Sequence, residues 1–169
     1  GLPVFLYSNG WNFIQIGGAL SLWTIGYGII QGIVPYLIPQ NKNNVKNILK
    51  TTKAWCWILT SIPLFTLLLL EIELFLINKT FIISGLIIFG VVFAINSSLH
   101  SYLILAFAGT KKVAENVGFY YAANASGRLV GTLLSGLLYQ HNGLNACVVG
   151  SAVFLIICMI FTLFIINEI

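Results

Sequence analysis

Apolar residues occur in this chain as long runs, separated by short polar segments. A helix needs about 20 residues, at about 1.5 Å of rise each, to cross a hydrocarbon core of about 30 Å. The pattern predicts five complete transmembrane helices, over residues 13–38, 54–77, 81–108, 113–139 and 143–167. Residues 1–8 are expected to be the end of a truncated span, and residues 39–53 a polar loop.

The composition indicates a membrane protein. Hydrophobic residues make up 59% of the sequence and charged residues only 7%, whereas charged residues are about 25% of an ordinary soluble domain. We therefore predict an all-α polytopic membrane protein, in which residues 1–169 form one transmembrane unit within the lipid bilayer. The basic residues form no recognisable reading motif, so nucleic acid is not an expected partner.

The lysines are distributed unevenly between the two sides of the predicted bundle. The lysines at 42, 46, 50, 53, 111 and 112 fall on one side, and only Lys79 falls on the other. Because short lysine-rich loops stay inside, the loop at 39–53 and the C-terminus are predicted to be cytoplasmic, with the protein in the inner (plasma) membrane. The lysines of this loop could also contact anionic lipid headgroups or a nucleotide, but orientation alone explains them.

The span at 113–139 carries an arginine within an apolar segment. One of its faces is small, with Ala123, Gly127, Gly131 and Ser135 at intervals of four, and the neighbouring face is polar, with Tyr121, Asn124, Arg128 and Thr132. Small residues allow helices to approach closely, and polar residues inside a membrane need protein or water around them. Arg128 is therefore either a contact for an anionic substrate, with Asn124 and Tyr121 beside it, or half of a structural ion pair.

Two other groups of polar residues lie within predicted spans. Trp23, Tyr27 and Gln31 follow one side of the first span at intervals of four, where they would line a cavity or form hydrogen bonds between helices. Asn96 and His100 are one turn apart in the third span, and either line the cavity or pack in a hydrogen-bonded core.

Acids, cysteines and histidines give no sign of catalysis. Glu71 and Glu73, close to Lys79, are predicted to form an interfacial cluster, and the cysteines at 56, 147 and 158 are interpreted as packing residues. Deep in the spans, His100 and Arg128 lack the acidic or cysteine partner that an active site would need. We therefore expect no enzymatic activity, no cofactor and no metal site.

Three stretches of the chain resemble a known transporter family. They are GGALSLWTIGYGIIQ (17–31), FAINSSLHSYLI (93–104) and VGFYYAANASGRLVGTLLSGLLYQ (117–140). They resemble the C-terminal half of a major facilitator superfamily transporter, and within it the organoarsenical efflux permeases called ArsJ. The resemblance implies half of a twelve-helix fold, with the N-terminal half of the same transporter missing from this sequence.

The resemblance also implies a function. ArsJ-like permeases are expected to export 1-arseno-3-phosphoglycerate by proton antiport, with a functional link to glyceraldehyde-3-phosphate dehydrogenase, which makes this small anionic substrate. By this analogy the substrate-binding residues would be Arg128, Asn124, Tyr121, Asn96, His100, Tyr27 and Gln31. The alternatives are a major facilitator transporter of a sugar, drug or other metabolite, and a membrane subunit that transports nothing.

Overall fold

The computed structural model describes residues 1–38, 45–71, 79–108 and 113–167 of the chain, and nearly all of these residues are helical. In order they are α1 (Leu2–Ser8), α2 (Phe13–Leu37), α3 (Val45–Glu71), α4 (Lys79–Phe107) and α5 (Val113–Asn167). The four long helices are long and apolar enough to cross a membrane. The chain is thus an all-α membrane protein, as its composition predicts.

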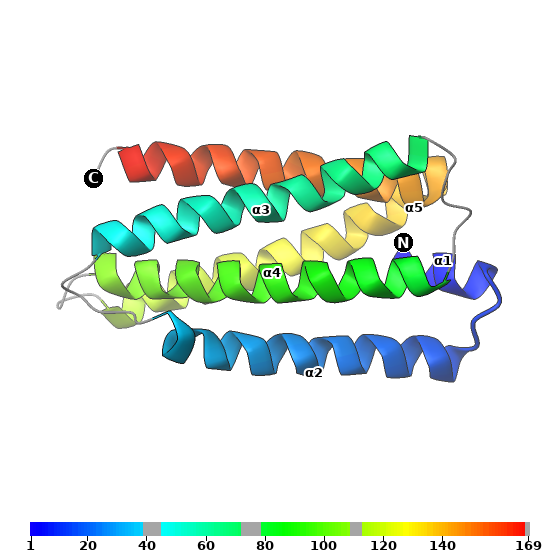
Figure 1. Ribbon diagram of the computed structural model, residues 1–169, viewed down its shortest axis with the longest axis horizontal. Coiled ribbons are helices and arrows are strands. Elements are labelled where there is room, and N and C mark those ends of the chain that lie inside the picture. Colours follow the sequence, from blue (N-terminus) through cyan, green and yellow to red (C-terminus); the bar gives the residue numbers. More distant parts are fainter. Residues whose placement is uncertain (39–44, 72–78, 109–112, 168–169) are drawn as a thin grey trace.

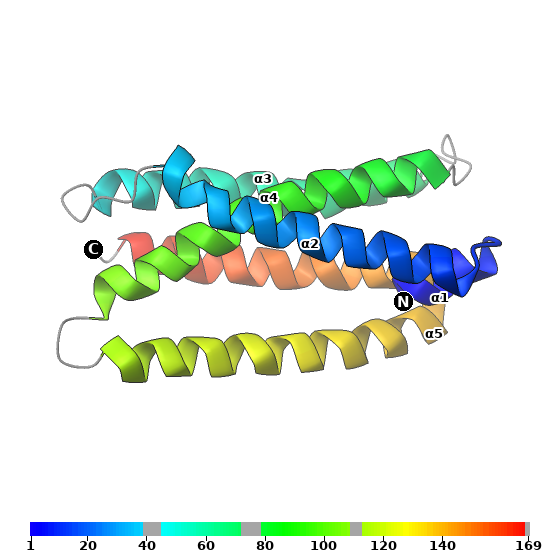
Figure 2. The ribbon, with the colours of Figure 1, turned by 90° about the horizontal axis from the view of Figure 1, so that it is seen from below.

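The longest helix, α5, is folded back on itself. Its 55 residues are interrupted at Asn142 and at Gly143, whose φ of 59° lies in the left-handed region that glycine tolerates. The first limb (113–141) and the second limb (144–167) run in opposite directions (Figures 1 and 2). The break falls within the turn between the predicted spans 113–139 and 143–167.

The first turn of α2 is fixed by a capping box. Asn12 accepts a hydrogen bond from the backbone N–H of Gln15 (2.8 Å), and the Gln15 side chain accepts one from the backbone N–H of Asn12 (3.1 Å). Gly10 precedes it with φ of 83°, so the chain turns sharply between α1 and α2. The predicted boundaries of this span, 13–38, differ from the observed helix by one residue.

The predicted loop at 39–53 is wrong over its second part, because α3 already begins at Val45. Ile48, Leu49 and Thr52 lie on one side of this helix and are buried, with Leu49 packed against Leu99 and Leu103 of α4. The lysines and asparagines obscured this spacing in the sequence. Residues 39–44, the end of the predicted span 54–77 and Glu73 lie outside the described residues.

The helices pack as a bundle with much of its surface apolar. Helix α2 packs on α4, and α3 packs on both α4 and α5 (Figure 1). Large apolar side chains remain exposed all around, including Ile14, Leu22, Phe65, Leu133, Phe161 and Phe164. In a bilayer these side chains face lipid, so their exposure needs no further partner.

Candidate functional site

The polar stripe of α2 faces α4. The indole N–H of Trp23 donates to the backbone carbonyl of Leu86 (2.7 Å), and the Gln31 amide donates to the Ser97 hydroxyl (3.3 Å). Both alternatives for this stripe are therefore found, because Trp23 and Gln31 form hydrogen bonds between helices and Trp23 and Tyr27 also line a cavity.

Tyr27 lies between these two hydrogen bonds in an aromatic stack. Its ring centroid is 6.0 Å from that of Trp23 and 5.5 Å from that of Phe93, which in turn stacks on Phe89 at 5.7 Å. The interplanar angles of 9° to 28° describe stacked rings on the α2–α4 interface. Tyr27 is half-buried there.

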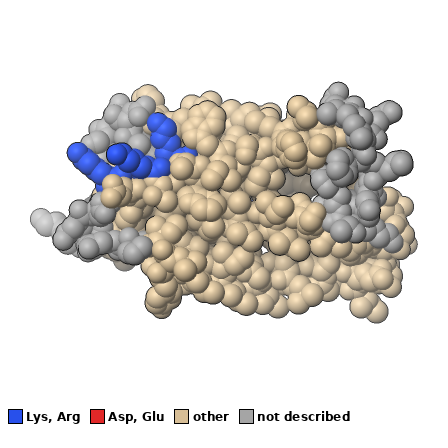
Figure 3. All heavy atoms as spheres, viewed as in Figure 1, with Lys and Arg blue, Asp and Glu red and all other residues tan. Residues whose placement is uncertain are grey.

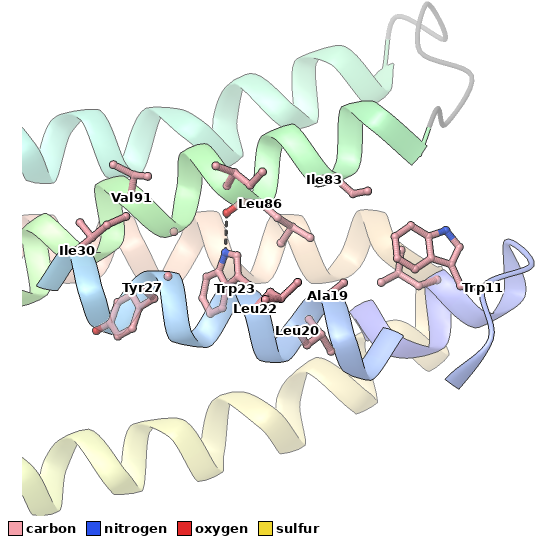
Figure 4. A pocket seen from close by; sticks show the side chains of 14 residues that line it. Trp11, Ala19, Leu20, Leu22, Trp23, Tyr27, Ile30, Ile83, Leu86 and Val91 are labelled. Carbon is pink, nitrogen blue, oxygen red and sulfur yellow. Dashed lines mark hydrogen bonds between the residues drawn. The ribbon is translucent and has the colours of Figure 1, made fainter. Parts of the chain in front are cut away.

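A cavity of about 370 Å³ opens beside this stack, between α2 and α4 (Figure 4). Trp11, Trp23, Tyr27, Leu86 and Val91 are among the side chains that line it. Its walls are almost entirely apolar. The indole N–H of Trp23 is already donated to the Leu86 carbonyl (Figure 4). This cavity therefore offers shape and apolar contact, and little to recognise an anion.

Asn96 and His100 belong to a second set of contacts, in the core between α3, α4 and the second limb of α5. The His100 ring is 2.9 Å from the Asn96 carbonyl oxygen through Nδ1 and 3.3 Å from the Thr162 hydroxyl through Nε2. The Cys56 thiol lies 3.6 Å from the Asn96 amide oxygen and 4.0 Å from His100 Nε2. We call Cys56, Asn96, His100 and Thr162 the core cluster.

The core cluster satisfies its own polar atoms. Asn96 is only 3% exposed and Cys56 4%, and the Thr162 hydroxyl also donates to the Cys158 carbonyl at 2.8 Å. These contacts correspond to the packing alternative for His100, because both ring nitrogens have partners within the bundle. The cysteine was expected to pack, but its position beside His100 was not foreseen.

Sequence reasoning missed two partners of His100, namely Cys56, which precedes it by 44 residues, and Thr162, which follows it by 62. A signal was present in α3, where Thr52, Cys56 and Thr60 recur every four residues and are all buried. Such a stripe of small polar residues on an apolar helix indicates a face that packs on another polar face.

The first limb of α5 has a different environment. Tyr121 is 64% exposed, Arg128 is exposed and Asn124 is half-buried. Within the described residues no ion pair involves Arg128, and the contact recorded at this residue is the Thr132 hydroxyl donating to the Arg128 carbonyl (2.8 Å). The guanidinium is therefore presented on the surface of the described bundle.

The small face of this limb is also open. A methyl group added at Gly127 or Gly131 would meet no atom within 4 Å, so the expected close helix contact is not made there by the described residues. Ser135 is the exception, since its carbonyl accepts a hydrogen bond from the Cys147 thiol (3.3 Å) of the second limb. Toward its start, the limb is held to α4 by the Tyr120 and Ser101 hydroxyls, 2.9 Å apart.

The seven candidate residues therefore fall into three groups. Tyr27 and Gln31 join α2 to α4, Asn96 and His100 form the core cluster, and the remaining three lie on the first limb of α5. No recorded contact links the first limb's polar face to the core cluster within the described residues. Tyr121, Asn124 and Arg128 form the group that offers exposed polar side chains to a ligand, whereas Tyr27 borders an apolar cavity.

No protein-family model, no curated protein and no solved structure matches this chain.

Proposed function

We propose that this chain is half of a secondary active transporter that exports a small anionic organic solute. Its substrate would be 1-arseno-3-phosphoglycerate, expelled by proton antiport, as the ArsJ-like stretches of the sequence imply. Support comes from that resemblance and from one observation, the exposed Arg128 in the middle of a membrane-length limb.

The depth of Arg128 gives that observation its weight. It lies 15 residues after Val113 and 14 before Asn142, roughly 20 Å from either end of the limb at about 1.5 Å per residue. A charge near the centre of a bilayer costs about 2.5 to 3.5 kcal/mol on insertion scales, so it is retained only where water, an acid or a ligand meets it. An exposed guanidinium at this depth needs such a surrounding.

The chemistry of arginine fits the proposed substrate. Its planar guanidinium can give two parallel hydrogen bonds to a phosphate or arsenate group, which the point charge of a lysine cannot reproduce. The Asn124 amide and the Tyr121 hydroxyl, one to two turns earlier on the same face, can add neutral donors. Gly127, with open space around it, leaves room for a ligand beside the arginine.

In this proposal the other four candidate residues act as scaffold. Gln31 and Tyr27 hold α2 on α4, and the core cluster holds α3, α4 and the second limb of α5 together. The two remaining open sides, the polar face and the small face of α5, would meet the opposing half of the transporter. Substrate sites of such transporters lie near the midplane between two halves.

The proposed orientation places the end that carries Lys46, Lys50 and Lys53 in the cytoplasm. These lysines gather at one end of the molecule (Figure 3), the end at which the C-terminus also lies (Figure 1). In a cysteine-free background, a cysteine replacing Asn142 should react with an impermeant reagent in intact cells, and one replacing Asn47 only after permeabilisation. Reaction of both from the same side would refute this topology.

The alternative with specific support is a membrane subunit that transports nothing. The hydrogen bonds of Gln31, Asn96 and His100 are explained by helix packing alone, without a substrate. Arg128 is not explained in this way, which is why we favour transport.

The deciding experiment measures export by the full-length protein in everted vesicles, with Arg128→Lys and Arg128→Ala compared at equal membrane abundance. A substrate contact predicts normal abundance and lost transport in both variants. A structural ion pair predicts poor folding of the alanine variant and substantial rescue by lysine. Leu129→Ala, at an exposed position of the same limb, is the matched control and should transport normally. Absence of flux in the wild type would overturn the proposal.

A further inference from the structure

Three lysines and a tryptophan lie on one narrow stripe of α3. Lys46, Lys50, Lys53 and Trp57 follow each other at intervals of four, three and four residues, which keeps them on one face of a helix. The lysines are exposed and Trp57 is 53% exposed. The stripe continues along the helix through Leu64 and Leu68, which are 45% and 55% exposed.

The helix gives this stripe a fixed geometry that a loop would not have. The opposite side of the same turns is occupied by the buried Ile48, Leu49 and Thr52, so α3 cannot rotate the lysines away. The first turn of α3 contains no acid to neutralise them. Figure 3 shows the resulting basic patch at one end of the molecule, and the tan surface beside it in this view carries no charged side chain.

We propose that this stripe is a binding site for one anionic phospholipid of the cytoplasmic leaflet. The ammonium groups of Lys50 and Lys53, assisted by Lys46, bind the headgroup phosphate, and Trp57 lies at the boundary between headgroup and hydrocarbon. One acyl chain then runs along Leu64 and Leu68. Leu64 and Leu68 lie roughly 10 and 16 Å along the helix from Trp57 at about 1.5 Å per residue, a length that matches the hydrocarbon thickness of one leaflet, about 15 Å.

The order of the residues favours a lipid over other phosphate ligands. To determine the orientation in the membrane, lysines need only lie on the cytoplasmic side, on any face of the helix. Here the charges are aligned, and the apolar residues follow in the sequence in which a phospholipid presents phosphate, interface and acyl chain. Two cavities of the described bundle, of about 370 and 350 Å³, are lined by other residues, so neither supplies a pocket for a nucleotide base beside the lysines.

The site can be tested by native mass spectrometry of the full-length protein, purified in a neutral detergent and titrated with phosphatidylglycerol or phosphatidylcholine. We expect the wild type to retain phosphatidylglycerol preferentially. The double variant Lys50→Gln/Lys53→Gln should bind it about 30-fold more weakly, the effect of two lysines near an anionic headgroup. Lys50→Arg/Lys53→Arg keeps both charges and should bind within about threefold of the wild type.

Two controls separate this site from general attraction between charges. Lys111→Gln/Lys112→Gln removes the same charge elsewhere in the chain and should leave binding near the wild-type value; an equal loss would overturn the proposal. Inorganic phosphate should not displace the lipid, since displacement would mean that the stripe binds free phosphate. Equal retention of both lipids by the wild type would also overturn it.

A spectroscopic measurement remains decisive if the glutamine variant does not fold. Phosphatidylglycerol with brominated acyl chains should quench tryptophan fluorescence more than its phosphatidylcholine counterpart, and the difference should disappear in Trp57→Leu. It should also shrink when ionic strength rises from about 0.01 M to about 1 M, because the Debye length falls from about 30 Å to about 3 Å. Quenching that is independent of headgroup or of Trp57 would refute the site. The inference does not depend on which solute the protein transports.

Discussion

Gly90 is the position at which one added methyl group should loosen α2 from α4. An alanine Cβ there would lie 2.6 Å from the Trp23 indole nitrogen and 3.0 Å from Cε2 of the same ring. That nitrogen donates the 2.7 Å hydrogen bond to the Leu86 carbonyl. Because a tryptophan ring is rigid, it has to move as a whole, and the hydrogen bond breaks with it. Gly90→Ala should therefore destabilise the protein.

The change in unfolding free energy follows from two destabilising contributions and one stabilising contribution. Overpacking costs about 1 to 3 kcal/mol, and the lost hydrogen bond about 1 kcal/mol more. Replacing glycine by alanine inside a helix returns about 1 kcal/mol. The net loss of unfolding free energy should thus be about 1 to 3 kcal/mol. Gly85→Ala is the matched control on the same helix, since its Cβ would meet no atom within 4 Å; it should be neutral or stabilising by up to about 1 kcal/mol.

The assay is reversible denaturation in mixed micelles, followed by circular dichroism on the full-length protein. Trp23→Phe removes the indole N–H and part of the clashing ring, so alanine at Gly90 should cost less in that background, with a coupling of about 1 kcal/mol or more. Equal stability of the Gly90 and Gly85 variants, or additivity with Trp23→Phe, would refute the packing described for α2 and α4.

Two further predictions concern single hydroxyl and imidazole groups. Tyr120→Phe should lower the unfolding free energy by about 0.5 to 1.5 kcal/mol through loss of the contact with Ser101. Tyr102→Phe should be neutral or stabilising, because the buried Tyr102 hydroxyl has no hydrogen-bond partner in the described bundle. The opposite order of the two stabilities would contradict both assignments. His100→Gln should insert normally and lose about 1 to 2 kcal/mol of stability with its two contacts. If the protein exports a solute as proposed, the pH dependence of that export should stay unchanged. An altered pH profile at unchanged stability would instead assign His100 to coupling.

The sequence was sufficient for the helical class and for most helix positions, because long apolar runs leave the backbone few alternatives to a helix. The boundary at the start of α3 was misjudged for a physical reason. Between Val45 and Lys53 the exposed lysines and Asn47 outnumber the apolar residues, and the spacing that decides the helix involves only a few buried residues. Average polarity therefore concealed a helical face.

Spacing along one helix also could not show which polar residues meet across helices. Tyr121, Asn124 and Arg128 were placed on one face correctly, since that follows from helical geometry alone. The approach of Cys56 and Thr162 to His100 depends on how three helices are rotated about their axes. That rotation is determined by packing over the whole bundle, which a single periodic stripe does not contain.

The bend at Asn142–Gly143 has a consequence for the biosynthesis of the protein. The first limb contains Arg128 and is a poor candidate to enter the bilayer by itself. The second limb has twelve Leu, Ile, Val and Phe residues between Leu144 and Phe164, which contribute about 4 to 7 kcal/mol in favour of insertion. Because only a tight bend separates the limbs, they can leave the translocon as a hairpin, and the second limb can offset the about 3 kcal/mol that the arginine costs the first. Insertion of Arg128 into the membrane would then depend on the second limb of α5, which follows it in the chain.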